Sequence, residues 1–156
     1  MATIQSVLAY YDAQLEYAAR DRDGDGVLEY AQKFISADNQ RDGLYWETSG
    51  NEMLSPLGPL FAETTPDGAY HGYYYRIITS QGANANGGAF SYLKDNQMTG
   101  GFALVAWPAE YGNTGVMSFI VNQDGVVYQQ NLGPDTAELA VRIQGFDPAP
   151  GWVPVE

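Results

Sequence analysis

The residues that most clearly suggest chemistry form an acidic loop near the start of the chain. Asp21, Asp23 and Asp25 alternate along the sequence, and Gly26 follows them. Hard cations such as Ca²⁺ need several oxygen ligands around one point, and alternate loop residues can converge on such a point. Glycine permits the sharp turn that this convergence requires. The spacing therefore predicts a calcium site.

The remaining ligands of a 12-residue EF-hand calcium loop come from later positions, counted from Asp21 as the first. Val27 offers its backbone carbonyl, and Glu29 stands at the ninth position. The twelfth position, where a bidentate glutamate is usual, is occupied by Gln32, which weakens the expected affinity. The alternative stays open that the loop is a solvated turn whose aspartates cap a following helix.

Few other residues suggest catalysis. His71 is the only histidine, and no nucleophile or second base can be recognised around it, so it is interpreted as structural. Aromatic side chains in a strand usually pack in the core or on the sheet. The alternative is a ligand surface formed by Tyr73, Tyr75 and Trp107. We therefore expect no catalytic residues and no organic cofactor, and Ca²⁺ is the one cofactor expected.

Composition and charge restrict the class of partner. The chain has 156 residues, no cysteine and a formal net charge of -12, with only seven lysines and arginines. Such an acidic chain is a poor partner for nucleic acid, because phosphate neutralisation requires clustered basic residues. Cations and basic protein surfaces would be attracted instead. No apolar run approaches the roughly 20 residues that span a bilayer.

Sequence periodicity predicts an α+β fold, with a long N-terminal helix packed on a small antiparallel sheet and a short C-terminal helix. Ile4, Val7, Leu8, Tyr11, Leu15 and Ala18 are assigned to one buried face of the first helix. A second short helix is expected from Leu28 to about Phe34. Strands are expected at about residues 72–79, 101–107, 115–121 and 126–131. The last two flank a turn at Asn122–Gly125, which is typical of a hairpin. A final helix is expected over 136–144, with Asp135 as N-cap and Glu138 three residues later.

Several long segments resemble one bacterial family. They are Glu16–Ala31, Gly43–Trp46, Ser55–Leu60, Tyr70–Arg76, Gly101–Gly112 and Gly125–Tyr128. Together they identify the chain as similar to the bacterial domain of unknown function 2950 family. The resemblance implies one globular domain over residues 1–156, the C-terminal domain of a longer exported protein. It also implies a periplasmic or extracellular location, with a signal segment preceding the present chain.

A more distant resemblance is to the globular heads of type IV pilin-like and type II secretion pseudopilin-like proteins. It is carried by Gly72–Tyr75, Ala106–Pro108, Gly112–Gly115, Phe119 and Asn122–Val126. The apolar assembly helix of a pilin is absent, so this resemblance implies a pilin-head-like fold only.

Two classes of function follow from these observations. The first is a non-enzymatic cell-envelope module that binds a protein partner or assembles, with Ca²⁺ in its acidic loop. The second is a carbohydrate-binding or hydrolytic envelope domain that uses the aromatic strand around Tyr73–Tyr75. The first class is favoured because no nucleophile, base and orienting group can be assembled from the sequence.

Overall fold

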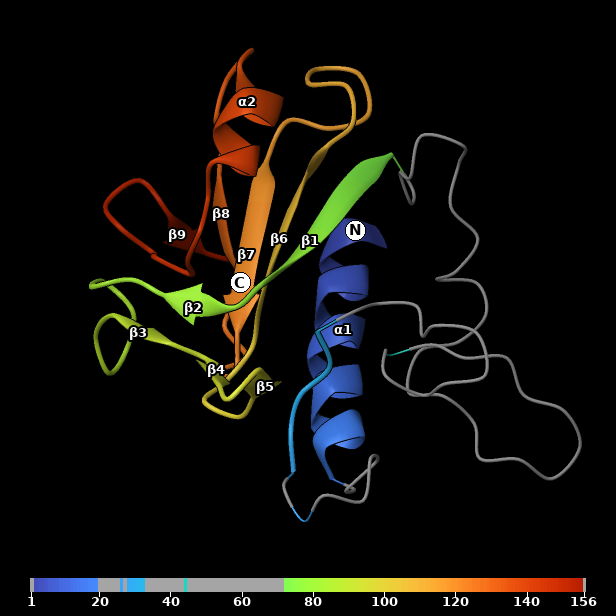
Figure 1. Ribbon diagram of the computed structural model, residues 1–156. Coiled ribbons are helices and arrows are strands. Elements are labelled where there is room, and N and C mark those ends of the chain that lie inside the picture. The colour runs from blue at the N-terminus through green and yellow to red at the C-terminus, as the bar shows by residue number, and fades with distance from the viewer. Residues whose placement is uncertain (1, 20–25, 27, 33–43, 45–71, 156) are drawn as a thin grey trace, which may run out of the picture.

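A computed structural model describes residues 2–19, 26, 28–32, 44 and 72–155 of the chain. Over these residues the fold is α+β, as predicted: one long helix and one short helix lie on a five-stranded antiparallel sheet (Figure 1). The helices are α1 (Ala2–Ala18) and α2 (Thr136–Val141). The sheet has the order β1-β6-β7-β8-β9, made of Tyr73–Ile78, Ala103–Pro108, Ser118–Asn122, Tyr128–Gln130 and Val153–Pro154.

Two small hairpins that the sequence did not predict lie between β1 and β6. In the first, β2 (Ser80–Gln81) pairs with β3 (Phe90–Ser91). In the second, β4 (Leu93–Lys94) pairs with β5 (Gln97–Met98), and their turn contains Asp95 and Asn96 at positive φ. Strands of two residues carry too little alternation of apolar and polar residues to be detected as strands.

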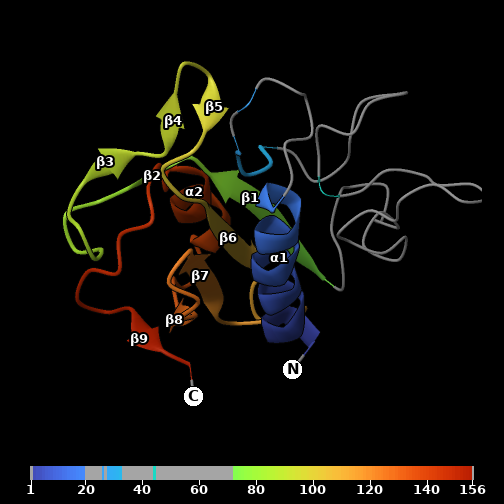
Figure 2. The same ribbon diagram turned by 90° about the horizontal axis from the view of Figure 1, so that it is seen from below.

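Both faces of the central sheet are covered, which explains why every residue of β6 and β7 is buried. The register places Leu104, Ala106, Phe119 and Val121 on one face, and α1 contacts this part of the sheet. The opposite face carries residues such as Ile120, and α2 and the C-terminal segment cover it (Figures 1 and 2). Strands buried on both faces are continuously apolar, as Ala103–Trp107 is.

The predicted hairpin at Asn122–Gly125 is confirmed. β7 and β8 pair antiparallel across it, and the Gly125 N–H donates to the Asn122 carbonyl at 2.9 Å. The Asn122 side-chain oxygen also accepts from the Asp124 N–H at 3.0 Å, and Gly125 has a φ of +77°. Asparagine stabilises turns in this way, and glycine adopts positive φ without steric cost. The turn is therefore specified by residues that are neighbours in the sequence.

The expected second helix at Leu28–Phe34 is wrong over residues 28–32, and residues 33 and 34 lie outside the described residues. Here the chain forms an isolated β-bridge, in which the Tyr30 N–H donates to the Met98 carbonyl at 2.8 Å. The buried Gln14 side chain donates to the Ala31 carbonyl and accepts from the Ala31 N–H. These long-range hydrogen bonds override the local helical pattern.

The buried face of α1 differs from the predicted one. Tyr10, Ala13, Gln14 and Tyr17 join Val7 in the interior, whereas Leu8 and Leu15 are 38% and 43% exposed. The polar Gln14 is fully buried because its amide satisfies the backbone of Ala31. A count of apolar residues alone cannot place such a side chain in the core.

The C-terminal helix is confirmed but ends at Val141 rather than at residue 144. Asp135 precedes it with φ -93° and ψ 21° and makes no side-chain capping hydrogen bond, so the expected capping box does not form. At the end of α2, Arg76 donates to the carbonyl of Ala140 and to that of Ile143, which follows the helix. A guanidinium in this position interacts favourably with the C-terminal end of a helix, where carbonyl groups carry partial negative charge.

Three core tyrosines should make the protein sensitive to alkali. Burial raises the pKa of Tyr10, Tyr73 and Tyr92 above the ordinary value of 10.0, and for Tyr10 the hydrogen bond from Gln14 opposes this only in part. Above pH 10 the unfolded chain releases these protons while the folded chain retains them, so the stability present below pH 10 is lost as the pH rises.

The expected loss is about 1.4 kcal/mol per pH unit for each tyrosine that stays protonated. Urea unfolding measured between about pH 9 and pH 11 checks it. The Tyr10→Phe variant should show a shallower dependence of unfolding free energy on pH, whatever its absolute stability. Identical slopes for the two proteins would contradict the assignment.

Candidate functional site

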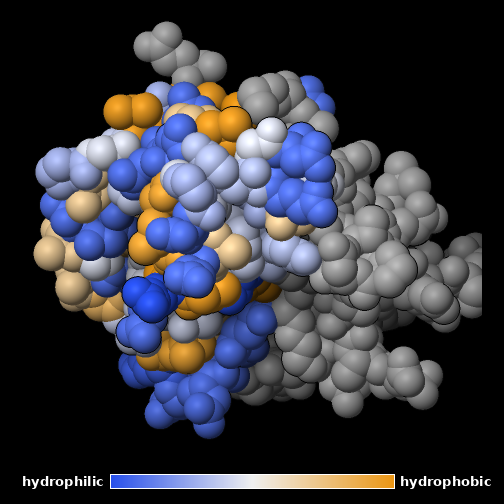
Figure 3. Space-filling model, turned by 90° about the horizontal axis from the view of Figure 1, so that it is seen from above, coloured by the Kyte–Doolittle hydropathy of each residue, from blue (hydrophilic) through white to orange (hydrophobic). Residues whose placement is uncertain are grey.

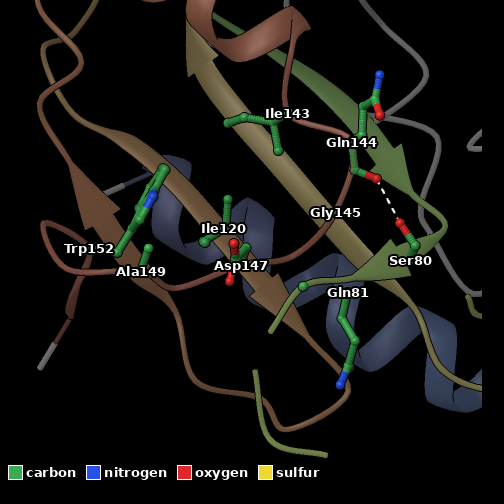
Figure 4. Close-up of a pocket in the computed structure, with 10 residues that line it drawn as sticks. Ser80, Gln81, Ile120, Ile143, Gln144, Gly145, Asp147, Ala149 and Trp152 are labelled. Atoms are coloured by element: carbon green, nitrogen blue, oxygen red, sulfur yellow. Dashed lines mark hydrogen bonds between the residues drawn. The ribbon is translucent and has the colours of Figure 1, made fainter. Parts of the chain in front are cut away.

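The candidate site is a pocket between the first small hairpin and the C-terminal segment. It has a volume of about 500 Å³. Ser80 and Gln81 lie on one side and Trp152 on the other (Figure 4), and Gly82 also lines the pocket. The remaining lining residues are Ile120, Ile143, Gln144, Gly145, Asp147 and Ala149. The pocket is thus mainly apolar, with one carboxylate.

Backbone hydrogen bonds hold the two sides of the pocket together. The Phe146 N–H donates to the Ser80 carbonyl and the Gly82 N–H donates to the Phe146 carbonyl, both at 2.9 Å. The Ser80 hydroxyl donates to the Gln144 carbonyl at 2.8 Å, as Figure 4 shows. Because these bonds join segments far apart in the sequence, the site is formed only when the domain is folded.

One carboxylate oxygen of Asp147 accepts two hydrogen bonds from Asn84. Its Oδ1 accepts from the Asn84 backbone N–H at 2.9 Å and from the Asn84 side-chain amide at 2.8 Å. Gly82 lies so close that an added Cβ would stand 2.5 Å from the Asp147 Cγ. Glycine at position 82 is therefore needed for the carboxylate to occupy its place.

Few of the described lining residues carry groups that could take part in catalysis. Asp147 is the only titratable side chain among the lining residues that the structure describes, and Ser80 uses its hydroxyl to bind a carbonyl. Nucleophilic catalysis needs a nucleophile and an adjacent base, and acid–base catalysis needs a titratable group beside the reacting atoms.

The three residues of the candidate aromatic surface do not share one face. Tyr73 and Tyr75 are on the face of β1 toward α1, and Tyr73 is 3% exposed, with its hydroxyl donating to the Met117 carbonyl at 2.9 Å. Trp107 pairs with Tyr74 on the opposite face, with ring centroids 5.8 Å apart. The fold therefore separates Trp107 from the two tyrosines.

Four of the predicted calcium ligands, Asp21, Asp23, Asp25 and Val27, lie outside the described residues, as does His71. Glu29 and Gln32 are described, and the Gln32 amide nitrogen donates to the Asn96 carbonyl at 2.9 Å. Across the described ranges, no three His, Cys, Asp or Glu residues come close enough to hold a metal ion.

The pocket residues were not identified from the sequence. Asp147 and Trp152 lie in a C-terminal segment rich in proline and glycine, which suggests only a turn. No local signal connects this segment with Ser80–Gly82. The proximity of an isolated carboxylate and an aromatic residue in one turn-rich segment is the single clue that the sequence offers.

The face of the molecule at the α2 end shows no single dominant apolar area (Figure 3). Figure 3 views the molecule from the end where α2 lies, and hydrophobic and hydrophilic residues are interspersed there. Leu139 and Val141 of α2 are among the exposed apolar side chains. In the part of the chain that the structure covers, no helix is sufficiently long and apolar to traverse a membrane.

Comparison with known proteins gives one match. The family model described as Protein of unknown function (DUF2950) matches residues 1–155. No curated protein and no solved structure was found to match the chain, and the likeness to pilin-like heads is not shown by these comparisons. Since the family model covers almost the whole length, the chain belongs to the family described as Protein of unknown function (DUF2950).

Proposed function

We propose that this domain is a non-enzymatic binding module of the bacterial cell envelope, and that its partner is a protein with a basic surface. The observation that carries the proposal is the pocket between β2 and the C-terminal segment, which combines apolar walls and Trp152 with one carboxylate. The formal net charge of -12 supports a basic partner, because opposite potentials speed encounter and favour the complex.

A carbohydrate is the second candidate ligand. Trp152 is partly exposed at the pocket, and an aromatic ring beside polar groups is a surface on which a sugar can stack. A protein partner is favoured because the polar groups of Ser80 and Gln81 already make hydrogen bonds within the domain, whereas a sugar presents many hydroxyls that need partners.

Two arrays test the proposal on the pure domain. One carries peptides graded by net positive charge, and the other carries glycans. Binding should rise with peptide charge and should weaken as salt is added, since exposed charges are screened. Robust glycan binding, or turnover of any glycan, would favour the carbohydrate candidate instead. Fractionation of cells that express the full-length gene tests the envelope location, and unprocessed protein in the cytosol would contradict it.

Calcium in the acidic loop is the second part of the proposal. Gly26 has a φ of +83°, the left-handed conformation that the sixth position of a calcium loop requires. The fold fixes both flanks of the loop, since α1 ends at Ala18 and Tyr30 is bound to β5 through Met98. Three carboxylates brought to one point repel one another, and a divalent cation offsets that repulsion.

Ca²⁺ is therefore expected to raise the melting temperature, because it binds the folded loop more tightly than the unfolded one. A Ca²⁺ concentration about 100 times the Kd would add about 2.7 kcal/mol to the unfolding free energy. Mg²⁺ should have a smaller effect, and Asp23→Ala should abolish the rise. Thermal unfolding with Ca²⁺ or EDTA measures this. An unchanged melting temperature, together with no heat of Ca²⁺ binding, would mean that the loop is only a turn.

A further inference from the structure

The pocket holds a negative charge that no described residue neutralises. The described residues that line it include Asp147 but no lysine, arginine or histidine. The described residues that contact the Asp147 carboxylate do so through the neutral backbone and side chain of Asn84. A carboxylate against apolar walls favours a cationic ligand, because a nearby opposite charge is attracted more strongly there than in bulk water.

The geometry of Asp147 also restricts the shape of that cation. Both hydrogen bonds from Asn84 fall on Oδ1, and none from a described residue falls on Oδ2. A guanidinium binds a carboxylate best with two parallel N–H groups, one to each oxygen. With Oδ1 already accepting two hydrogen bonds, a compact ammonium group on Oδ2 fits better than a bidentate guanidinium.

The rest of the pocket suits the chain that carries such an ammonium. Ile120, Ile143 and Ala149 provide apolar contacts, and Trp152 provides an aromatic ring (Figure 4). A lysine side chain buries its four-carbon stem against apolar surface while the charged end stays at the rim. An indole ring attracts an ammonium placed over its face.

We propose that this pocket binds a lysine side chain of the protein partner, with the ammonium on Asp147 Oδ2 and the stem against Ile120, Ile143 and Trp152. The inference rests on the proposed function and names the group by which the basic partner is recognised. Asp147 provides the charge selectivity, and Asn84 and Gly82 hold it in position.

Titration of the domain with small probes tests this directly. The probes are Nα-acetyl-lysine N-methylamide, whose side-chain ammonium is free, its arginine equivalent and the uncharged norleucine equivalent. The readout is the indole N–H signals of the three tryptophans in a ¹⁵N NMR spectrum, with Trp152 assigned through Trp152→Phe. The lysine probe should shift the Trp152 signal selectively and bind about tenfold more tightly than the norleucine probe. The arginine probe should bind more weakly than lysine.

Two matched variants distinguish the effect of the Asp147 charge on binding from a general effect of removing one carboxylate from the domain. Asp147→Asn keeps the side-chain shape and an oxygen that accepts from Asn84, and should weaken lysine binding about fivefold or more. Asp12→Asn makes the same change of charge at an exposed position on α1, across the sheet, and should leave binding unchanged.

The outcomes distinguish this inference from the proposed function. Equal binding of norleucine and lysine, or unchanged lysine binding by Asp147→Asn, would overturn the lysine pocket. If basic peptides still bound the Asp147→Asn domain on the array, the basic partner would be retained and its contact would lie elsewhere. A Trp152 shift produced by glycans but not by lysine would instead favour the carbohydrate candidate.

Discussion

Replacing Phe102 with alanine is expected to lower the free energy of unfolding by about 3–5 kcal/mol, the usual cost of removing a buried aromatic side chain. Phe102 is fully buried and lies among three tyrosine rings. The ring centroids of Tyr10, Tyr11 and Tyr30 stand 5.8, 5.8 and 4.8 Å from it. These tyrosines come from α1 and from the segment 28–32, so one ring joins both to the start of β6.

Urea unfolding followed by circular dichroism measures this loss. Phe90→Ala is the matched control, because Phe90 is 40% exposed on the first small hairpin and contacts the Tyr92 ring from outside the core. Its expected cost is about 1 kcal/mol. Equal losses for the two variants would show that Phe102 is not the centre of this aromatic cluster.

Replacing Gln14 with alanine is expected to cost about 3 kcal/mol, although the residue is polar. The Gln14 amide donates to the Ala31 carbonyl at 2.8 Å and to the Tyr10 hydroxyl at 2.9 Å, and its oxygen accepts from the Ala31 N–H at 2.7 Å. The substitution leaves the buried Ala31 N–H and C=O without these partners. Each unsatisfied buried group costs about 1–3 kcal/mol.

Gln5→Ala provides the control on the same helix, because Gln5 is exposed, and its effect should stay within about 0.5 kcal/mol. Amide hydrogen exchange adds a local readout. In Gln14→Ala the Ala31 amide should exchange faster than the amides of β6 and β7, since the segment is no longer bound to α1. Retained protection at Ala31 would mean that Tyr30 and Met98 alone hold the segment.

Loss of the Gln14 contacts also bears on the acidic loop. The segment 28–32 follows the loop directly, and its position depends on Gln14 from one side and on Met98 from the other. A calcium loop binds its ion best when its ends are held at the correct separation, because less ordering entropy is then lost on binding. The stability of this segment and the proposed affinity for Ca²⁺ are thus physically connected.

The elements that the sequence determined are those whose cause is local. Asn122 and Gly125 form their turn with each other's atoms, and the flanking apolar runs become β7 and β8. The run from Ala103 to Trp107 is apolar throughout and stops at a proline, which predicts a buried strand. For α1 the sequence determined the helix itself. The calcium ligands of the acidic loop stay a prediction, made from a pattern that lies within a few residues.

The tertiary structure decided every feature that depends on distant partners. Gln14 is buried and Leu15 exposed because the amide, unlike the leucine, satisfies a backbone that only folding brings near. Residues 28–32 form no helix because β5 and α1 offer them hydrogen bonds that compete with one. The pocket arises in the same way: Asp147 faces Gly82 and Asn84 only after the C-terminal segment returns across the sheet. Local propensity cannot encode such proximity, because its energy comes from contacts that exist only in the folded domain.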